Sequence, residues 1–207
     1  TLDADRQALE SVHTDALFAP DISVIYPGGA QSTTRIEVPG VGYGLEDDAR
    51  PGFFIGVATV VARLFNLVQP DCALFGEKDY QQLAVICAMT RDLCWPIDII
   101  GVPTVREPDG LAMSSRNQYL TAAEREQAPL LHQILMRVAE QIAAGSPHYG
   151  ALESEAHKLL AEGGFVPDYV SIRHADSLQP AVEGELRCVV LAAARLGQAR
   201  LIDNVAV

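Results

Sequence analysis

The stretch that decides the fold runs from Cys72 to Val102 and reads CALFGEKDYQQLAVICAMTRDLCWPIDIIGV. Its pattern predicts a short strand at Cys72 to Phe75, a helix at about Tyr80 to Leu93 and a strand at Ile97 to Val102. A long apolar helix is expected just before it, at about Phe53 to Leu67. Strands and helices that alternate at these lengths are typical of a parallel α/β sheet.

The chain changes character after Pro103. Thr121-Ala-Ala-Glu124 matches a capping box, so a helix is expected from Ala122 to Ala144. A second helix is expected at about Tyr149 to Ala161, ending at Gly163-Gly164 because glycine tolerates a positive φ. Three strands joined by turn-forming segments should follow, at Tyr169 to Arg173, Cys188 to Ala194 and Arg200 to Ile202. These elements predict a small α+β domain with an antiparallel sheet.

The first residues resemble the middle of a domain. Thr1 to Ser11 has the pattern of a helix end, and Ala16 to Pro20 has that of a strand. We therefore expect further residues of the same domain upstream of Thr1. The Gly/Pro-rich stretch from Tyr26 to Gly44 is expected to be a loop or a short edge hairpin.

Composition excludes several classes of protein. The formal net charge of −12 argues against nucleic-acid binding, which needs a stripe of Lys and Arg. No apolar run approaches the length of a membrane span, so we expect a soluble protein with no membrane partner. The four cysteines form no C-x-x-C pair and the five histidines show no metal-ligand spacing, so no structural metal is expected.

The first chemical cluster is Phe75-Gly-Glu-Lys-Asp79, where a strand should end and a helix begin. Ligands of open parallel sheets bind at this position, and backbone amides at a helix start attract phosphate. Gly76 is expected to allow a tight turn, and Lys78 adds a positive charge beside the amides. In the alternative, purely structural interpretation, Asp79 is an N-cap and Gln82 completes a capping box. That alternative leaves Lys78 unexplained, because a cation opposes the helix dipole there.

The second cluster is a loop from Val105 to Asn117, VREPDGLAMSSRN. Ser114 and Ser115 can donate hydrogen bonds to phosphate oxygens, and Arg116 can bind two oxygens in a planar fork. Alternatively the segment is a solvated connector in which Ser115 or Asn117 caps a short helical turn. By itself the pattern favours neither interpretation.

Together the two clusters resemble the pantothenate synthetase family of the nucleotidyltransferase superfamily. Phe75-Gly-Glu-Lys-Asp-Tyr-Gln-Gln82 and Asp109-Gly-Leu-Ala-Met-Ser-Ser-Arg-Asn117 are similar to the two signature segments of that family, at its spacing. Arg50-Pro-Gly52, Gly56-Val-Ala-Thr-Val-Val61 and Arg200-Leu-Ile-Asp-Asn204 also resemble it, so the similarity covers nearly the whole chain.

The resemblance implies two domains. Residues 1–104 would be the remainder of a Rossmann-like nucleotide-binding domain, a parallel sheet with helices on both faces whose first strand and helix are missing. Residues 105–207 would be a C-terminal α+β lid domain with an antiparallel sheet.

The resemblance also implies an ATP-dependent, AMP-forming ligase that joins pantoate to β-alanine through a pantoyl-adenylate, with Mg²⁺. Lys78, Ser114, Ser115 and Arg116 would be catalytic, and Gln82 would bind pantoate. ATP would contact Gly76, Glu77, Lys78, Asp79, Val105, Met113, Ser114, Ser115 and Arg116. Partners would be these small molecules and a second copy in a cytoplasmic homodimer, without nucleic acid.

Two departures from the family pattern bear on activity. The family's Met-Gly-x-Leu-His-x-Gly-His loop, whose histidines bind ATP phosphates, does not occur in the sequence. Phe53 stands where the family usually has a histidine, which is either a repacking at a helix start or the loss of a polar substrate contact. Two alternatives therefore accompany the ligase: a truncated or degenerate remnant without catalysis, and another adenylate-forming nucleotidyltransferase. The missing basic face disfavours an aminoacyl-tRNA synthetase.

Overall fold

The computed structural model describes residues 2–145, 148–185 and 187–207, and the chain forms two compact units, Thr1–Thr34 and Arg35–Val207. The first unit holds α1 (Leu2–Ser11), α2 (Ile22–Ile25) and the 3₁₀ helix η1 (Ala30–Ser32). The helix expected at the start is confirmed. The strand expected at Ala16 to Pro20 is wrong, because this short, largely exposed run is irregular and pairs with no strand of the described residues.

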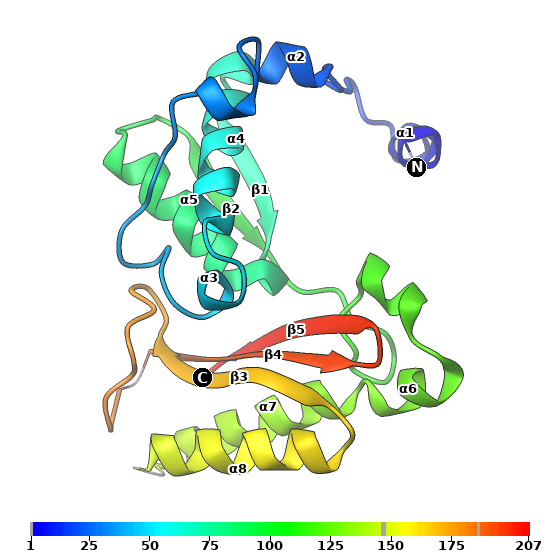
Figure 1. Ribbon diagram of the computed structural model, residues 1–207, viewed down its shortest axis with the longest axis vertical. Helices are drawn as coiled ribbons and strands as arrows, with labels where there is room; N and C mark the ends of the chain where they lie inside the picture. Colours follow the sequence, from blue (N-terminus) through cyan, green and yellow to red (C-terminus); the bar gives the residue numbers. More distant parts are fainter. Residues whose placement is uncertain (1, 146–147, 186) are drawn as a thin grey trace. The chain divides into compact units, whose positions relative to one another are not determined.

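The α/β pattern of the second unit is confirmed. After the four-residue helix α3 (Glu46–Ala49) come α4 (Phe53–Val68), β1 (Cys72–Gly76), α5 (Tyr80–Asp92) and β2 (Asp98–Val102). The two strands pair in parallel, from Cys72 opposite Asp98 to Gly76 opposite Val102 (Figure 1). The expected boundary between residues 104 and 105 falls inside this compact unit and stays a prediction.

Helices α4 and α5 pack on one face of the parallel strands. Phe65 of α4 meets the ring of Phe75 at 6.3 Å and that of Trp95 at 5.8 Å, and Val85 and Ile86 of α5 are fully buried in the same cluster. Leu74 and Ile100, which alternate with the inward residues along β1 and β2, are exposed. The stretch from Tyr26 to Gly44 has no strand, so it is a loop and not a hairpin in the structure.

The C-terminal region has the predicted antiparallel sheet. Its strands β3 (Val166–His174), β4 (Cys188–Leu196) and β5 (Ala199–Ala206) lie in the order β3-β4-β5. Before them come η3 (Ser115–Tyr119), α6 (Ala122–Gln127), α7 (Leu130–Ala143) and α8 (Tyr149–Glu162), and α7 and α8 lie along one face of the sheet (Figure 1). Within the described ranges, no helix is long and apolar enough to cross a membrane.

The helix predicted from Ala122 to Ala144 is two helices in the structure. The capping box is confirmed, since the side chains of Thr121 and Glu124 each bond the backbone of the other residue. Pro129 separates α6 from α7 because proline has no N–H to continue the helical hydrogen bonds.

The central strand β4 is buried on both faces, which explains its apolar run from Cys188 to Ala194; the next residue, Arg195, is exposed. Val190 and Ala192 pack toward α7 and α8, whereas Val189 and Leu191 join the apolar cluster of α4 and α5. This strand therefore connects the two apolar cores, and the residues of the candidate site lie around their junction.

Candidate functional site

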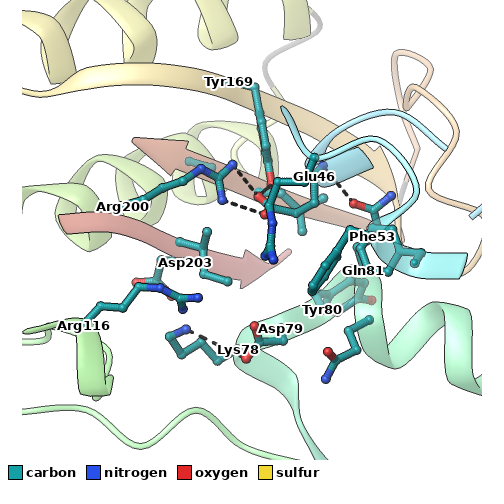
Figure 2. A pocket seen from close by; sticks show the side chains of 16 residues that line it. Glu46, Phe53, Lys78, Asp79, Tyr80, Gln81, Arg116, Tyr169, Arg200 and Asp203 are labelled. Atoms are coloured by element: carbon teal, nitrogen blue, oxygen red, sulfur yellow. Dashed lines mark hydrogen bonds and ion pairs between the residues drawn. The ribbon is translucent and has the colours of Figure 1, made fainter. Parts of the chain in front are cut away.

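A cavity of about 360 Å³ lies where the turn after β1 faces the antiparallel sheet. Its walls come from α3, the start of α4, the start of α5, the three C-terminal strands and η3 (Figure 2). The lining residues are Glu46, Arg50, Phe53, Phe54, Lys78, Asp79, Tyr80, Gln81, Gln82, Arg116, Tyr169, Leu191, Ala192, Arg200, Ile202 and Asp203.

The turn after β1 brings Lys78 into the cavity wall. The 3₁₀ helix η2 (Glu77–Asp79) follows β1 directly and leads into α5. The side chain of Lys78 is 15% exposed, and its Nζ lies 3.9 Å from Asp79 Oδ2, at the outer limit of an ion pair. Asp79 occupies the N-cap position of α5 as expected, but its side chain makes no capping hydrogen bond, so the expected capping box with Gln82 does not form. Lys78 therefore retains donors for an anion in the cavity.

The expectation that Gly76 allows a tight turn is wrong. Its φ of −68° and ψ of 130° are ordinary extended values that any residue adopts, so no tight turn requires glycine here. A Cβ at Gly76 would meet no atom within 4 Å. Neither the conformation nor the space around this position requires glycine.

The loop that carries Arg116 is ordered by Ser114. Ser114 Oγ accepts a hydrogen bond from the backbone N–H of Arg116 at 3.2 Å and caps η3. The expectation that Ser115 or Asn117 is the cap is therefore wrong. Asn117 instead donates from Nδ2 to the carbonyl of Ala112 at 3.1 Å. The exposed side chain of Arg116 lines the cavity and forms no ion pair with any described carboxylate.

The structure brings together part of the predicted site. Lys78, Asp79, Gln82 and Arg116 line the main cavity, and Ser114 lines a smaller adjoining pocket together with Lys78. The other predicted residues lie apart from the main wall: Glu77 packs near Gly101, Gly76 ends β1, and Val105, Met113 and Ser115 are exposed.

A buried ion-pair network forms one wall that the sequence did not assign to the site. Arg200 donates to both carboxylate oxygens of Glu46 at 2.6 and 2.9 Å, and it also reaches Asp168 Oδ2 at 2.6 Å. Tyr169 donates its hydroxyl proton to Glu46 Oε1 at 2.9 Å (Figure 2). Burial and the Glu46 carboxylate raise the pKa of Tyr169 far above its usual value. Burial opposes the charge of Arg200, but its bonds to Glu46 and Asp168 outweigh this and raise its pKa.

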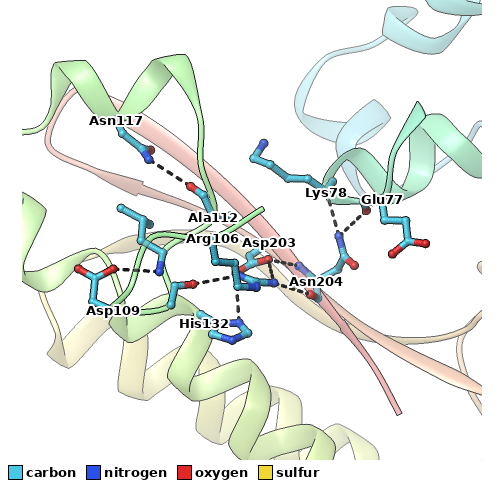
Figure 3. A network of polar contacts seen from close by, with 11 residues as sticks. Glu77, Lys78, Arg106, Asp109, Ala112, Asn117, His132, Asp203 and Asn204 are labelled. Atoms are coloured by element: carbon cyan, nitrogen blue, oxygen red, sulfur yellow. Dashed lines mark hydrogen bonds and ion pairs between the residues drawn. The ribbon is translucent and has the colours of Figure 1, made fainter. Parts of the chain in front are cut away.

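A second network fastens the loop of residues 105–117 to β5. Arg106 donates to Asp203 at 2.7 and 2.9 Å and to the carbonyl of Gly110 at 3.1 Å (Figure 3). His132 Nδ1 lies 3.4 Å from Asp203 Oδ2 without the direction of a hydrogen bond. Burial and the neighbouring Arg106 lower the pKa of His132, while Asp203 opposes that shift. The shift favours the neutral form of the His132 imidazole.

Gln81 and Phe53 complete the opposite wall. The buried Gln81 amide accepts from the N–H of Glu46 at 3.1 Å and donates to the carbonyls of Val41 and Gly44 at 3.0 and 3.1 Å. The guanidinium carbon of Arg50 lies 3.7 Å from the centroid of the Phe53 ring, a cation–π contact. Phe53 thus contributes an apolar surface to the cavity and a support for Arg50.

The signal for these missed residues was weak in the sequence. The segment Arg200-Leu-Ile-Asp-Asn204 stood out only by resemblance, and Glu46 belongs to an acidic run that is ordinarily solvated. Arg106 and Asp203 are 97 positions apart and Glu46 and Arg200 are 154 positions apart, beyond the reach of local patterns. Among the residues that the structure describes, no group of three His, Cys, Asp or Glu side chains could hold a metal ion.

Comparison with known proteins relates this geometry to an enzyme family. The family described as pantoate-beta-alanine ligase matches residues 1–206. The pantothenate synthetase of Azotobacter vinelandii is 55% identical over all 207 residues, which span 73% of that protein. The pantothenate synthetase of Hahella chejuensis is 51% identical over all 207 residues, which also span 73% of that protein.

Solved structures agree with the sequence relatives. Pantothenate synthetase from Thermus thermophilus matches with a TM-score of 0.91 and 44% identity, over 99% of this chain and 74% of that one. Pantoate-beta-alanine ligase from Francisella tularensis, complexed with beta-gamma ATP and beta-alanine, matches with a TM-score of 0.76 and 32% identity, over 100% of this chain and 70% of that one. These matches confirm the predicted fold class, and the chain belongs to the pantoate–β-alanine ligase family.

Proposed function

We propose that the protein joins pantoate to β-alanine through a pantoyl-adenylate, consuming ATP and releasing AMP and pyrophosphate. The observation that carries the proposal is that Lys78 and Arg116 line one cavity while neither is held in a close carboxylate pair of the described residues. In a chain of net charge −12, two such cations favour an anionic ligand at this place. The Francisella tularensis relative was crystallised with a form of ATP and with β-alanine.

The predicted residues take the following roles in this proposal. Lys78, Ser114, Ser115 and Arg116 bind the phosphates and stabilise the charge that develops on them. Gln82, in the same wall as Lys78, binds pantoate. Gly76, Glu77 and Asp79 offer the backbone and side chains of the turn after β1 to ATP, Val105 faces the adenine, and Met113 covers the phosphates.

The reaction needs positioning more than covalent chemistry by the protein. A carboxylate oxygen of pantoate attacks the α-phosphorus of ATP, and the bond to the bridging oxygen of pyrophosphate breaks. The amine of β-alanine then attacks the acyl carbon of the adenylate, loses a proton and expels AMP. Lys78 and Arg116 lower the barrier of the first step by neutralising the oxygens of the leaving pyrophosphate.

Mg²⁺ is part of the proposal as a companion of the nucleotide. Mg²⁺ commonly keeps several waters and binds one or two carboxylates together with substrate phosphates. Glu46 and Asp203 already bind arginines, so Asp79 is the carboxylate of the described cavity wall that fits this role. The ion would supply additional positive charge to the phosphates.

The setting of the enzyme follows the family resemblance. We propose a cytoplasmic homodimer whose residues 105–207 act as a lid over the domain of residues 1–104. Support for the lid comes from the position of the loop of residues 105–117, which carries Arg116 and connects the two parts. Light scattering on the purified protein measures its oligomeric state.

The experiment that tests the function uses protein made from its complete natural coding sequence. AMP release is measured with ATP, Mg²⁺, pantoate and β-alanine, and each substrate is omitted in turn. Release that requires all three substrates supports the ligase. Adenylate formation with another carboxylic acid and not with pantoate would favour the alternative of another adenylate-forming nucleotidyltransferase. Absence of all turnover would favour the alternative of a non-catalytic remnant.

A further inference from the structure

One side chain outside the predicted site holds the turn that carries Lys78. Asn204 of β5 donates from Nδ2 to the carbonyl oxygen of Glu77 at 2.9 Å and to that of Lys78 at 3.0 Å (Figure 3). These contacts join residues 126 and 127 positions apart in the chain. The amide of this β5 residue therefore binds two consecutive peptide groups of η2.

The chemistry of the contact suits asparagine. A side-chain amide carries two N–H donors, so one Nδ2 atom can serve two carbonyl acceptors. An aspartate of the same shape, when ionised, has acceptors only and would face two carbonyl oxygens without a proton to share. The contact is therefore sensitive to replacement of a single atom.

Asn204 is itself held firmly. Its backbone N–H donates to Asp203 Oδ1 at 2.8 Å, and Asp203 is 3% exposed and bound twice by Arg106. Arg106 belongs to the loop that leads to Arg116. Asp203 and Asn204 thus fasten, from neighbouring positions of one strand, the two segments that supply the cations of the cavity.

The ammonium group of Lys78 lacks a comparable anchor. Its described ion-pair contact is the 3.9 Å approach to Asp79, which is too long to fix a flexible side chain. The direction in which Lys78 points consequently depends on the placement of its backbone. One of the two carbonyl oxygens that Asn204 binds is that of Lys78 itself.

We propose that Asn204 is a positioning residue for the reaction, which orients Lys78 toward the phosphates of the nucleotide by holding the carbonyls of Glu77 and Lys78. This inference rests on the proposed function. Asn204 touches neither substrate nor reacting atoms in this role. Its effect passes entirely through Lys78.

The test is a double-mutant cycle on the single-turnover rate of pantoyl-adenylate formation at saturating ATP and pantoate. Asn204→Ala is expected to lower this rate about tenfold, a change of about 1.4 kcal/mol in the barrier. In the Lys78→Ala background the same substitution is expected to lower the rate less than about twofold, because the positioned group is gone. An equal factor in both backgrounds, or an unchanged rate in Asn204→Ala, would overturn the proposal.

Matched variants separate positioning from general damage. Asn204→Asp keeps the shape and is expected to slow the reaction at least as much as Asn204→Ala, whereas Asn66→Asp adds the same charge on the exposed side of α4 and should leave the rate unchanged. Loss of folding in both Asn204 variants, seen as a lost thermal transition, would also overturn the proposal. If the wild-type protein forms no adenylate, the proposed function fails by itself, independently of Asn204.

Discussion

Besides Arg50, which stacks on the Phe53 ring, two kinds of cation lie in the cavity wall or close to it. Arg200 and Arg106 are each bound twice by one carboxylate, with N–O distances from 2.6 to 2.9 Å to Glu46 and Asp203. Lys78 has a carboxylate only at 3.9 Å, and Arg116 has no ion-pair partner among the described residues. A bidentate pair leaves an arginine little capacity for a ligand, whereas the second kind keeps its donors available. The paired arginines hold parts of the fold together, and we expect Lys78 and Arg116 to bind the ligand.

The two kinds also differ in the segments that they connect. The pair of Arg200 and Glu46 joins residues 154 positions apart, and the pair of Arg106 and Asp203 joins residues 97 positions apart. Lys78 and Arg116 instead sit on short 3₁₀ turns, η2 and η3. Loss of the carboxylate that binds Arg200 or Arg106 should therefore destabilise the fold, whereas loss of Lys78 or Arg116 should slow the reaction.

The largest effect is expected from Glu46→Ala. It removes the acceptor of Arg200 and of the Tyr169 hydroxyl at a site where the Glu46 side chain is 12% exposed, so the free energy of unfolding should fall by about 3 kcal/mol. Urea unfolding followed by circular dichroism measures it. Glu162→Ala, which removes an exposed i,i+4 partner of Lys158, is the matched control and should cost less than about 0.5 kcal/mol. Equal losses for the two variants would contradict the comparison.

A smaller effect, on rate and not on stability, is expected from Lys78→Ala. Because Lys78 is the less tightly paired kind of cation, pantoyl-adenylate formation should slow at least about tenfold, or about 1.4 kcal/mol. Single-turnover measurements with ATP and pantoate test the rate, and thermal unfolding tests the fold. An unchanged rate would remove Lys78 from the proposed site, and a lost thermal transition would place it among the structural cations.

Removal of the Thr121 cap tests whether a loss of stability alone slows the reaction. Thr121 caps α6, which follows the turn that carries Arg116, and Thr121→Ala should lower the free energy of unfolding by about 1 kcal/mol. The adenylation rate at 25 °C should stay unchanged, because no cation is lost. If the rate fell as it does in Lys78→Ala, stability and not charge would explain both results.

The sequence was sufficient for the elements whose causes are local. The strands and helices from Phe53 to Val102 follow from apolar periodicity, and the capping box at Thr121 lies within four residues. Lys78 and Arg116 were found because their surroundings in the sequence contain glycine and serine at turns. The same local reasoning missed the break at Pro129, where an apolar period continues across a residue that cannot donate a hydrogen bond.

Long-range contacts explain what the sequence could not predict. Nothing near Glu46 in the chain indicates that it would bind Arg200, and nothing near Asn204 points to the carbonyl of Lys78. The strand expected at Ala16 to Pro20 failed for a related reason, since a strand exists only with a partner. The contacts that form the cavity wall could therefore be identified only from the fold, whereas Lys78 and Arg116 could be proposed from the sequence.

The smallest effect is expected at Arg125, which pairs with Asp109 near the surface. Arg125 has a carboxylate partner, like Arg200, but its side chain is partly exposed. The hydrogen bond from Arg125 holds the pKa of Asp109 below its usual value near 3.9. Because the folded-state pKa is the lower one, the pair stabilises the fold fully above the unfolded pKa and loses that contribution as the pH falls through the folded pKa. A carboxyl NMR titration should show the pKa of Asp109 rising toward its usual value in Arg125→Ala, with the adenylation rate at pH 7 unchanged. A pKa that stays low without Arg125 would assign the shift to the backbone N–H of Leu111, which also donates to Asp109.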